Sequence, residues 1–444
     1  MNVDIKACLD NLDIKYDLNQ AYINELFLLI RQMLKPLYKN YMLKKKNILK
    51  HIYDYFTNNM NINPLVINIS KLKQPVQRSQ EWYDARYNKI TASEIASVIG
   101  TDTSNICESE LKKIYKKPAF KNSYELLKTK ILKNDEFKGN IYTDWGILFE
   151  PIATLIYEHR NNTHIIEFGL IEHPTLDIIA ASPDGITQHE ATMIEIKAPY
   201  SRKLSNTVPL NYWIQMQLQM ETCNLDKCDF VEIKTKLYSY DEFINDTNDI
   251  KEDSLLTKEN LEKGLIIKCI NNIDNIDKID YYYPEYDVFR SMYKSIKWAN
   301  ERTNYYKTMY TCVEIIYWKL NEYSCITVNR DKNWFKSTYC KFEEFWKKVV
   351  YFRNNIDEFL TMDRLKEEEK LKKKQKLNKE EFARTNVLTM LDSDSDNDDT
   401  NKILTQETNV DNINNLCDSV DSITESLNVD LINLDSSNII NDLG

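Results

Sequence analysis

Two short apolar runs on either side of a Pro-Asp-Gly turn constrain the fold of this chain more than any other feature. Residues 178–182 predict a buried strand, and residues 193–198 predict another. The chain has only seven glycines, so Gly185 in the turn marks a position that needs positive φ or a close backbone approach. Helical patterns surround these strands, so the segment 79–236 predicts a mixed α/β core.

The second strand carries a carboxylate and an ammonium group. Side chains alternate between the two faces of a strand, so Glu195 and Lys197 share one face while Ile196 lies on the other. A turn after the first strand brings Asp184, eleven residues before Glu195, to the same end of the sheet. The spacing therefore predicts two carboxylates and an ammonium group held close together.

These groups suit the hydrolysis of a phosphodiester. Mg²⁺ prefers oxygen ligands, which Asp184, Glu195 and the main-chain carbonyl of Ile196 supply. The ion lowers the pKa of the attacking water, and Lys197 holds that water or adds charge to the transition state. A surface Glu–Lys pair on an edge strand is the plainer interpretation. The S-P-D-G turn and the apolar strand before each motif favour the metal site.

Two helical segments add candidates to this site. In residues 144–160, the sequence W-G-I-L-F-E-P makes Glu150 a candidate third carboxylate, and Pro151 predicts a kink or restart of the helix. Residues 210–222 predict an amphipathic helix, on which Gln215 is a candidate partner for the scissile phosphate or the water. A solvated helix face is the alternative for both Glu150 and Gln215.

The segment 79–100 has the features of a phosphate site. Trp82 and Arg86 lie one turn apart on an expected helix, and the T-x-x-E sequence at 91–94 predicts the start of the next helix. Ser93 then lies in the first turn, where backbone N–H groups attract anions. A capped core helix with Arg86 in a salt bridge explains the same residues equally well.

A basic stretch, residues 112–133, is a candidate for contact with a DNA backbone. Lysines that neutralise phosphates give an affinity that falls as salt rises. A solvated helix face is the more common meaning of such a run. The candidate residues are Lys112, Lys113, Lys116, Lys117 and Lys121.

Acidic charge is concentrated at one end of the sequence. The formal net charge is -10, but residues 391–444 carry 13 Asp and Glu against one Lys, so the remainder is nearly neutral. Low hydrophobicity and high charge predict that these residues are disordered. Nine cysteines without a C-x-x-C pair argue against a disulfide framework. The sequence shows no membrane-spanning run and no secretory signal, so we expect an intracellular protein.

The patterns along the chain predict five parts. Apolar residues recur at helical spacing through much of the first 60 residues, and residues 61–77 predict a linker or a short strand. The expected parts are a helical region (1–76), a nuclease core (77–240), an α/β extension packed on the core (241–363), a charged helix (364–390) and the acidic tail (391–444).

Six motifs in order resemble one known family. R-S-Q-E-W-Y-D-A-R, I-T-A-S-E, W-G-I-L-F-E-P, A-S-P-D-G, I-E-I-K-A-P and Y-W-I-Q-M-Q are similar to the YqaJ-like viral recombinases. This family includes the lambda-type alkaline exonucleases and belongs to the PD-(D/E)XK nuclease superfamily. The resemblance covers residues 80–221 and implies a restriction-endonuclease-like core, with a mixed sheet flanked by helices.

The resemblance also implies roles for individual residues. Mg²⁺, with Mn²⁺ as a substitute, binds at Asp184 and Glu195, with Glu150 as a further carboxylate and Lys197 and Gln215 in support. The 5′-phosphate of a duplex end is held by Arg86, Ser93 and Ser182.

The implied reaction is 5′-to-3′ degradation of one strand of linear double-stranded DNA, in recombination, repair or genome processing. It leaves a 3′ single strand for a single-strand annealing protein as partner. Some members form rings around DNA. The regions before residue 79 and beyond 236 have no counterpart in the compact phage enzymes, so monomer and ring-like homo-oligomer stay open.

The later half of the chain looks like versions of this family from large eukaryotic DNA viruses, on the basis of the sequences I-Y-W-K-L and F-W-K-K-V-V. Host cytoplasm, nucleus and virion stay open as locations.

A structure-specific or nicking endonuclease with the same metal site is the first alternative. A degenerate nuclease fold that only binds DNA is the second, and the intact Asp184, Glu195 and Lys197 argue against it.

Overall fold

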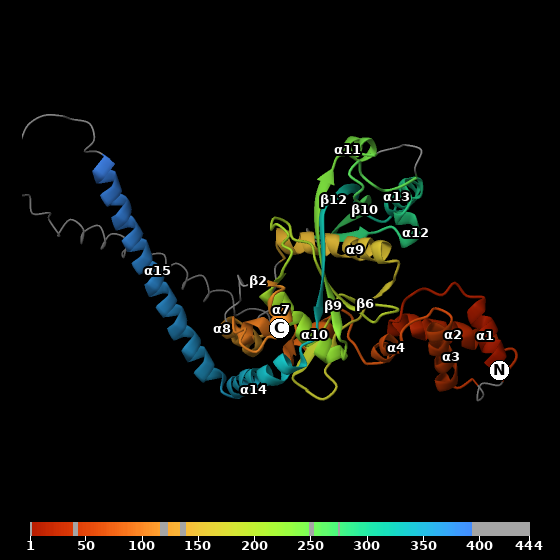
Figure 1. The fold of residues 1–444 in the computed structure, drawn as a ribbon, viewed down its shortest axis with the longest axis horizontal. Coiled ribbons are helices and arrows are strands. Elements are labelled where there is room, and N and C mark those ends of the chain that lie inside the picture. The colour runs from red at the N-terminus through yellow and green to blue at the C-terminus, as the bar shows by residue number, and fades with distance from the viewer. Residues whose placement is uncertain are drawn as a thin grey trace, which may run out of the picture. The chain divides into compact units, whose positions relative to one another are not determined.

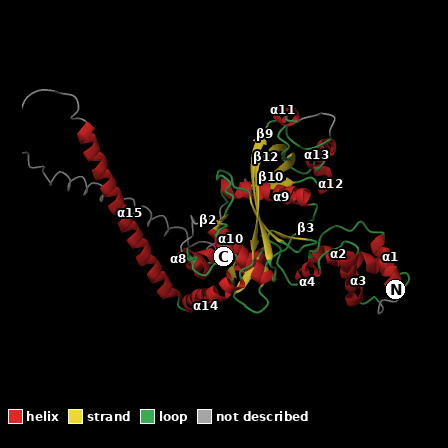
Figure 2. Ribbon diagram, viewed as in Figure 1, coloured by secondary structure: helices red, strands yellow, loops and turns green. Residues whose placement is uncertain are grey.

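The computed structural model describes residues 2–38, 43–115, 123–133, 139–247, 253–273 and 276–392. The chain divides into two compact units, Met1–Leu360 and Thr361–Gly444, which are described separately. All strands among the described residues lie in the first unit, which has a mixed α/β architecture (Figures 1 and 2). This confirms the fold class expected from the sequence.

Four helices form the beginning of the first unit. Ile23, Leu26 and Ile30 recur at helical spacing and are buried, whereas Met33 in the same pattern is exposed. Residues 64–70 form a helix rather than the expected linker or strand, because Asn63 caps it and Pro64 starts it. The helices are α1 (Asn2–Asp10), α2 (Gln20–Leu34), α3 (Lys45–Asn58) and α4 (Pro64–Ser70).

A seven-stranded mixed sheet forms the centre of this unit, in the order β11-β10-β12-β9-β7-β6-β3. Strands β7 and β9 are parallel, and the other neighbours are antiparallel. The strands are β3 (Ile165–Ile166), β6 (Gly185–Thr187), β7 (Met193–Lys197), β9 (Lys227–Tyr238), β10 (Lys263–Ile273), β11 (Ile276–Tyr282) and β12 (Cys312–Asn329).

Two smaller sheets accompany it. One has the order β1-β5-β4 and the other pairs β2 with β8. The expected strand at 178–182 is therefore real, but it belongs to a different sheet from β7. The strands are β1 (Ile90–Thr91), β2 (Ile114–Tyr115), β4 (Ile171–Glu172), β5 (Ile179–Ala181) and β8 (Val208–Pro209).

Helices α9 (Ile141–Asn161) and α10 (Leu210–Cys223) pack on the central strands. Phe149 and Ile152 of α9 share a buried apolar cluster with Ile194 and Ile196 of β7. Side chains alternate along β7, so the opposite face of this strand, which carries Glu195, is turned toward α10. The sheet thus holds β7 between the two helices, with Glu195 on the face toward α10.

Shorter helices and the last long helices complete the chain. Phe359, near the start of α15, is fully buried and packs on Phe352 and Tyr124 within the first unit. These helices are α5 (Gln80–Tyr87), α6 (Ile95–Ile99), α7 (Glu108–Leu111), α8 (Ser123–Leu132), α11 (Tyr240–Asn245), α12 (Tyr286–Phe289), α13 (Met292–Tyr306), α14 (Lys332–Asn354) and α15 (Ile356–Asp392).

Several sequence expectations concern parts of the chain that the structure leaves undescribed. The acidic tail lies outside the described residues from 393 onward. The expected domain boundaries stay predictions, although β10, β11 and β12 of the expected extension lie in the same sheet as β7. Within the described ranges, no helix combines the length and apolar character needed to span a bilayer.

Candidate active site

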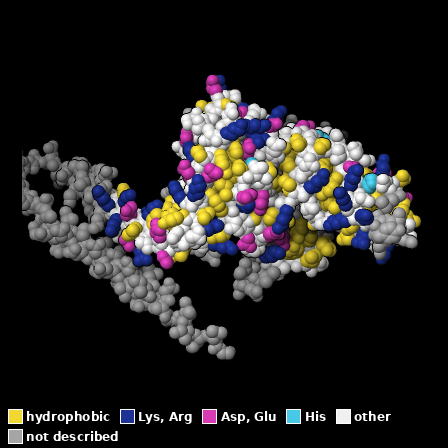
Figure 3. All heavy atoms as spheres, turned by 90° about the horizontal axis from the view of Figure 1, so that it is seen from below, with side chains coloured by type: hydrophobic (Ala, Val, Ile, Leu, Met, Phe, Trp, Pro, Cys, Tyr) yellow, Lys and Arg dark blue, Asp and Glu magenta, His cyan; other side chains and the backbone are white. Residues whose placement is uncertain are grey.

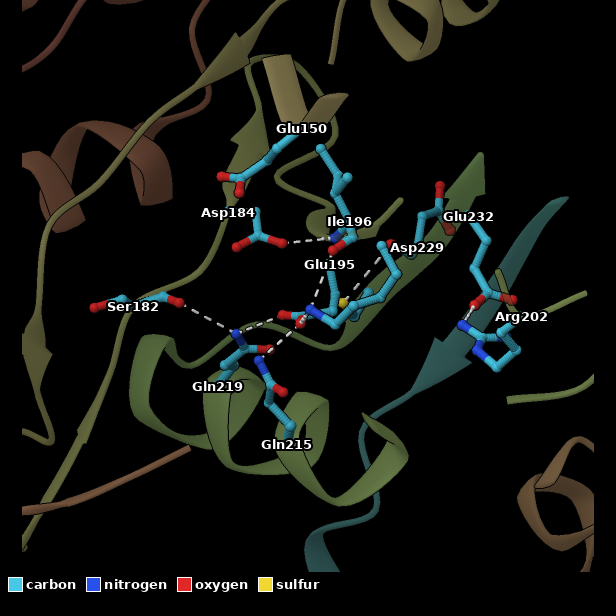
Figure 4. A network of polar contacts seen from close by, with 12 residues as sticks. Glu150, Ser182, Asp184, Glu195, Ile196, Arg202, Gln215, Gln219, Asp229 and Glu232 are labelled. Carbon is cyan, nitrogen blue, oxygen red and sulfur yellow. Dashed lines mark hydrogen bonds and ion pairs between the residues drawn. The ribbon is translucent and has the colours of Figure 1, made fainter. Parts of the chain in front are cut away.

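Asp184 lies in the turn directly before β6, the antiparallel neighbour of β7. Gly185 is paired with Ile194 in the antiparallel register. A Cβ atom at Gly185 would lie 2.1 Å from Cγ2 of Ile165, so this position requires the close approach that only glycine allows. The Ile196 N–H donates to Asp184 Oδ2 at 2.6 Å. The turn therefore places the Asp184 carboxylate beside the segment 195–197 (Figure 4).

Glu195 is fully buried, and α10 supplies its hydrogen-bond donors. The Gln215 amide donates to Oε1 at 2.7 Å, and the Gln219 amide donates to Oε2 at 2.8 Å (Figure 4). Gln219 also donates to the Ser182 carbonyl at 3.3 Å, so it joins β7 to the turn before Asp184. Sequence reasoning did not assign Gln219 to the site, although its i,i+4 spacing from Gln215 places it on the same helix face.

Lys197 is held beside Glu195 as an ion pair. Its Nζ atom also donates to the Ile196 carbonyl at 3.1 Å and lies 5.1 Å from the centre of the Tyr212 ring. Burial opposes the charged form, but the Glu195 and Asp184 carboxylates outweigh it, so the pKa of Lys197 is raised. Lys197 is therefore a fixed positive charge at neutral pH.

Glu150 approaches the same place from α9. Of the kink or restart expected at Pro151, the restart is not found, because the helix runs continuously from Ile141 to Asn161. The Glu150 carboxylate lies 3.8 Å from the Arg78 guanidinium. Burial and the charge of Glu195 raise the pKa of Glu150, while Arg78 and Lys197 act in the opposite direction.

The charges of Asp184, Glu195 and Glu150 thus act on one another in this part of the chain. Burial, followed by the charges of Glu195 and Glu150, raises the pKa of Asp184 well above its ordinary value. Hard oxygen ligands in this number fit Mg²⁺ in chemical type, and a divalent cation would offset the excess charge.

The side chains as arranged do not form a ready metal cage. Among the described residues, no three His, Cys, Asp or Glu side chains are grouped closely enough to hold an ion. Both oxygens of Glu195 already accept hydrogen bonds from Gln215 and Gln219. A cation ligated by Asp184 and Glu195 together would therefore require at least one of these contacts to open.

A cleft of about 740 Å³ leads to Asp184 and Glu150. One wall comes from residues 16–21, before and within α2, and another from residues 74–78. The remaining lining comes from α9 and from residues 165–169. The cleft gives solvent and small groups access to two of the three carboxylates.

The three residues expected to hold a 5′-phosphate lie near one another, on a site built around Trp82. Arg86 stacks on the Trp82 ring at 4.4 Å and donates to Ser93 Oγ at 3.4 Å. The Trp82 indole N–H donates to Ser182 Oγ at 3.1 Å. Arg86 also lies 3.5 Å from Glu94, so the alternative salt bridge is formed as well.

The helix after Ser93 begins later than the sequence suggests. α6 starts at Ile95 with Glu94 as its N-cap, and it has five residues. Half of the expected capping box is present, since the Thr91 N–H donates to Glu94 Oε2 at 2.9 Å. Ser93 therefore precedes the helix instead of lying in its first turn, and the helix-terminus argument for an anion at Ser93 falls away.

The structure describes two of the five candidate backbone-binding lysines. Lys112 is paired with Glu108 at 2.9 Å, and Lys113 with the buried Glu110 at 2.8 Å. Lys113 also donates to the Thr327 carbonyl at 2.9 Å, so it has structural partners. Lys116, Lys117 and Lys121 lie outside the described residues. Basic and acidic side chains both occur over the described part of the face shown in Figure 3.

Comparisons with known proteins identify relatives of this chain. Residues 81–226 match the profile of the YqaJ-like viral recombinase domain. An uncharacterized protein of Acanthamoeba polyphaga mimivirus is 29% identical over 320 residues, which are 65% of this chain and 55% of that protein. This chain thus spans about half the length of that relative.

A protein of African swine fever virus is 24% identical over 315 residues, covering 61% of this chain and 85% of the viral protein. Among solved structures, an alkaline exonuclease from Laribacter hongkongensis aligns with a TM-score of 0.34 and 19% identity. That alignment covers 64% of this chain and 99% of the bacterial chain.

Proposed function

This chain carries a YqaJ-like viral recombinase domain at residues 81–226, and from that premise we propose that it is a Mg²⁺-dependent deoxyribonuclease. Its proposed substrate is linear double-stranded DNA, one strand of which it degrades from the end in the 5′-to-3′ direction. Mn²⁺ is the expected substitute ion. The 3′-ended strand left behind is the substrate class of a single-strand annealing protein, which is the partner we propose.

The convergence of Asp184, Glu195, Lys197 and Glu150 is the observation that carries the proposal. These residues come from the turn before β6, from β7 and from α9, and their charges perturb one another. Structural ion pairs also perturb pKa values, so the cleft that reaches Asp184 and Glu150 is the further feature that favours an active site here. Crowded acids with raised pKa values are typical of a site that binds a cation.

The residues of this chain have separate tasks in the proposed reaction. A bound Mg²⁺ would neutralise the phosphate and lower the pKa of the attacking water. Lys197 stays protonated because its pKa is raised, so it orients that water and stabilises negative charge and does not act as a general base. Gln215 and Gln219 hold the Glu195 carboxylate in one orientation.

Preference for DNA ends rests on a second group of residues. Arg86, Ser93 and Ser182 offer a guanidinium and two hydroxyls for a terminal 5′-phosphate. Glu94 already pairs with the Arg86 guanidinium. We therefore expect Arg86 to add little to the total affinity for DNA and more to the preference for a 5′-phosphorylated end over an unphosphorylated one.

The test is digestion of 5′-phosphorylated linear duplex labelled at either end, with Mg²⁺. We expect the 5′ label to be released first and covalently closed circles to stay intact. Lys197→Ala should lower the rate by about 10²-fold or more while DNA binding is retained. Lys332→Ala, which removes a 59% exposed lysine far along the chain, is the control.

Two results would contradict parts of the proposal. Cutting of closed circles as fast as linear DNA would replace the exonuclease with an endonuclease that uses the same metal site. Unchanged cleavage by the Lys197→Ala variant would remove the assignment of the active site itself.

A further inference from the structure

Arg78 has an unusual backbone conformation next to the candidate active site. Its φ angle is 66°, in the left-handed region that residues other than glycine rarely adopt. Four of the seven non-glycine residues with positive φ in the described part of the chain are asparagines, which tolerate this region better than arginine does. Such a conformation persists only where the surrounding structure enforces it, and it is common at functional sites.

The residue before Arg78 is tied to the active-site turn. The Gln77 amide donates to the Phe168 carbonyl at 3.0 Å and to the Pro183 carbonyl at 3.4 Å. Pro183 directly precedes Asp184. A movement of Arg78 relative to Asp184 would therefore break contacts at both Phe168 and the turn.

Close packing with Gly169 fixes the rest of this segment. The Gly169 N–H donates to Gln74 Oε1 at 2.9 Å, and the Leu170 N–H donates to the Pro75 carbonyl at 3.0 Å. A Cβ atom on Gly169 would lie 2.2 Å from the Pro75 carbonyl oxygen, so the two backbones touch. Residues 74–78 thus form a strap that is held rigidly along one wall of the cleft.

The side chain of Arg78 lies in the cleft with Asp184 and Glu150. It is the one Lys or Arg among the described residues that line this cleft, whose acidic residues are Asp17, Glu150, Glu167 and Asp184. Its side chain is 55% exposed, and the 3.8 Å separation from Glu150 is too long for a hydrogen bond. A guanidinium has five N–H donors, so most of its capacity stays available to a ligand.

We propose that Arg78 binds an internucleotide phosphate of the DNA strand that enters this cleft. The assignment rests on the proposed function and adds a substrate-binding residue to it. A planar guanidinium matches two phosphate oxygens, and in a cleft lined by carboxylates it supplies the positive charge that a phosphate needs. An exposed ion pair with Glu150 is worth little by itself and would not explain a strained backbone.

The test compares Arg78→Gly with the wild type in binding and cleavage of a linear duplex. Glycine removes the guanidinium and also relieves the positive φ, so thermal unfolding should be unchanged or occur at a higher temperature. In metal-free buffer we expect the dissociation constant to rise by about tenfold. The slope of log K against log salt concentration should become shallower by about 0.9, the value for one lost phosphate contact on B-DNA.

Two matched variants show whether the effect is specific. Asn61→Gly makes the same backbone change at a φ of 54° outside the cleft lining, and Lys73→Ala removes a positive charge next to the strap. Both should bind DNA with the wild-type salt slope. An Arg78→Gly variant with the wild-type slope and affinity would overturn the proposal.

The nature of the phosphate is tested with two duplexes, one with a 5′-phosphate and one with a 5′-hydroxyl. An internucleotide contact predicts the same loss on both, and a loss confined to the phosphorylated duplex would overturn the assignment. The result is independent of cleavage, because the salt slope is measured without metal. A wild-type chain that binds DNA but does not cut it would contradict the proposed nuclease and leave the Arg78 measurement valid.

Discussion

Asp184 shows how its surroundings set the chemistry of one carboxyl group. It accepts a hydrogen bond from the Ile196 N–H, which favours the ionised form. Burial and the charges of Glu195 and Glu150 act against ionisation and prevail, so its pKa is raised. The folded chain therefore binds a proton at Asp184 more tightly than the unfolded chain does.

This difference predicts a pH dependence of stability without metal. From about the ordinary pKa of 3.8 upward, the unfolded chain loses the Asp184 proton first, so the free energy of unfolding falls as pH rises toward the raised pKa. Asp184→Asn removes this loss and should raise the free energy of unfolding at pH 7 by on the order of 1 kcal/mol. Urea denaturation in EDTA at pH 5 and pH 7 measures it.

Added Mg²⁺ should make the wild type more stable than the Asp184→Asn variant. At a concentration of 100 times the dissociation constant, a bound ion stabilises the wild type by about 2.7 kcal/mol. The Asp184→Asn variant should gain much less, because it lacks one ligand. Equal stabilisation of both proteins by Mg²⁺ would mean that the ion does not bind at Asp184.

A second prediction separates two neighbouring glutamines of α10. We expect the ion to displace Gln215 from Glu195 Oε1 and to leave the Gln219 contact with Oε2 in place. Gln219→Ala should then weaken Mg²⁺ binding by about 10- to 100-fold, because Glu195 loses the donor that still orients it. Gln217 faces away from the site and bonds to Asn329 and Asp331. Gln217→Ala should therefore lower stability but leave metal affinity unchanged. Calorimetric titration of both variants checks this, and equal metal affinities would refute the role of Gln219.

The residues of the site were predictable from sequence to different degrees. Strand alternation placed Glu195 and Lys197 together, because a period of two needs only a few residues to be recognised. Gln219 was missed, since a polar helix face looks the same whether it meets solvent or a buried carboxylate. The conformation of Arg78 left no sequence signal, because positive φ is normally read from glycine or asparagine.

At the scale of elements, the positions of individual helices and strands were predicted better than the pairing between strands. The patterns identified α10 and β7 with nearly correct ends. The partner of β7 was missed, because β6 has three residues and lacks a readable period. The strand predicted at 178–182 is present as β5, but it pairs with β1 and β4 and not with β7. Pairing depends on tertiary contacts that the sequence of one strand does not contain.

The contact between Gly169 and the strap gives a prediction at this scale. Gly169→Ala places a methyl group against the Pro75 backbone, which has no rotamer by which to move away. We expect a loss of about 1–3 kcal/mol in the free energy of unfolding, with DNA binding weakened as in Arg78→Gly. Gly146→Ala is the control for stability, because its Cβ meets nothing within 4 Å and alanine favours a helix. A stable Gly169→Ala variant with normal binding would show that the strap need not be rigid.

At the scale of the whole molecule, the central sheet joins segments that are distant in sequence. Strand β9 lies between β7 and β12, and β12 pairs with it from Lys227 to Tyr238. Trp318 and Leu320 of β12 share the apolar cluster of α9. The family match ends at residue 226, but the core that supports the site continues for about another hundred residues.

This continuity predicts opposite outcomes for two truncated chains. Ending the chain after residue 240 removes β12, which exposes one edge of β9 along its length and leaves the apolar face of α9 without Trp318. We expect this product to aggregate or to lack a cooperative unfolding transition.

Ending the chain after Leu360 keeps Phe359 in its buried position and removes only the second unit. This longer product should unfold within a few degrees of the full chain and cut linear DNA at a similar rate. A folded, active chain of residues 1–240 would show that the site needs no support from β12, and an unfolded chain of residues 1–360 would show that the first unit is not autonomous.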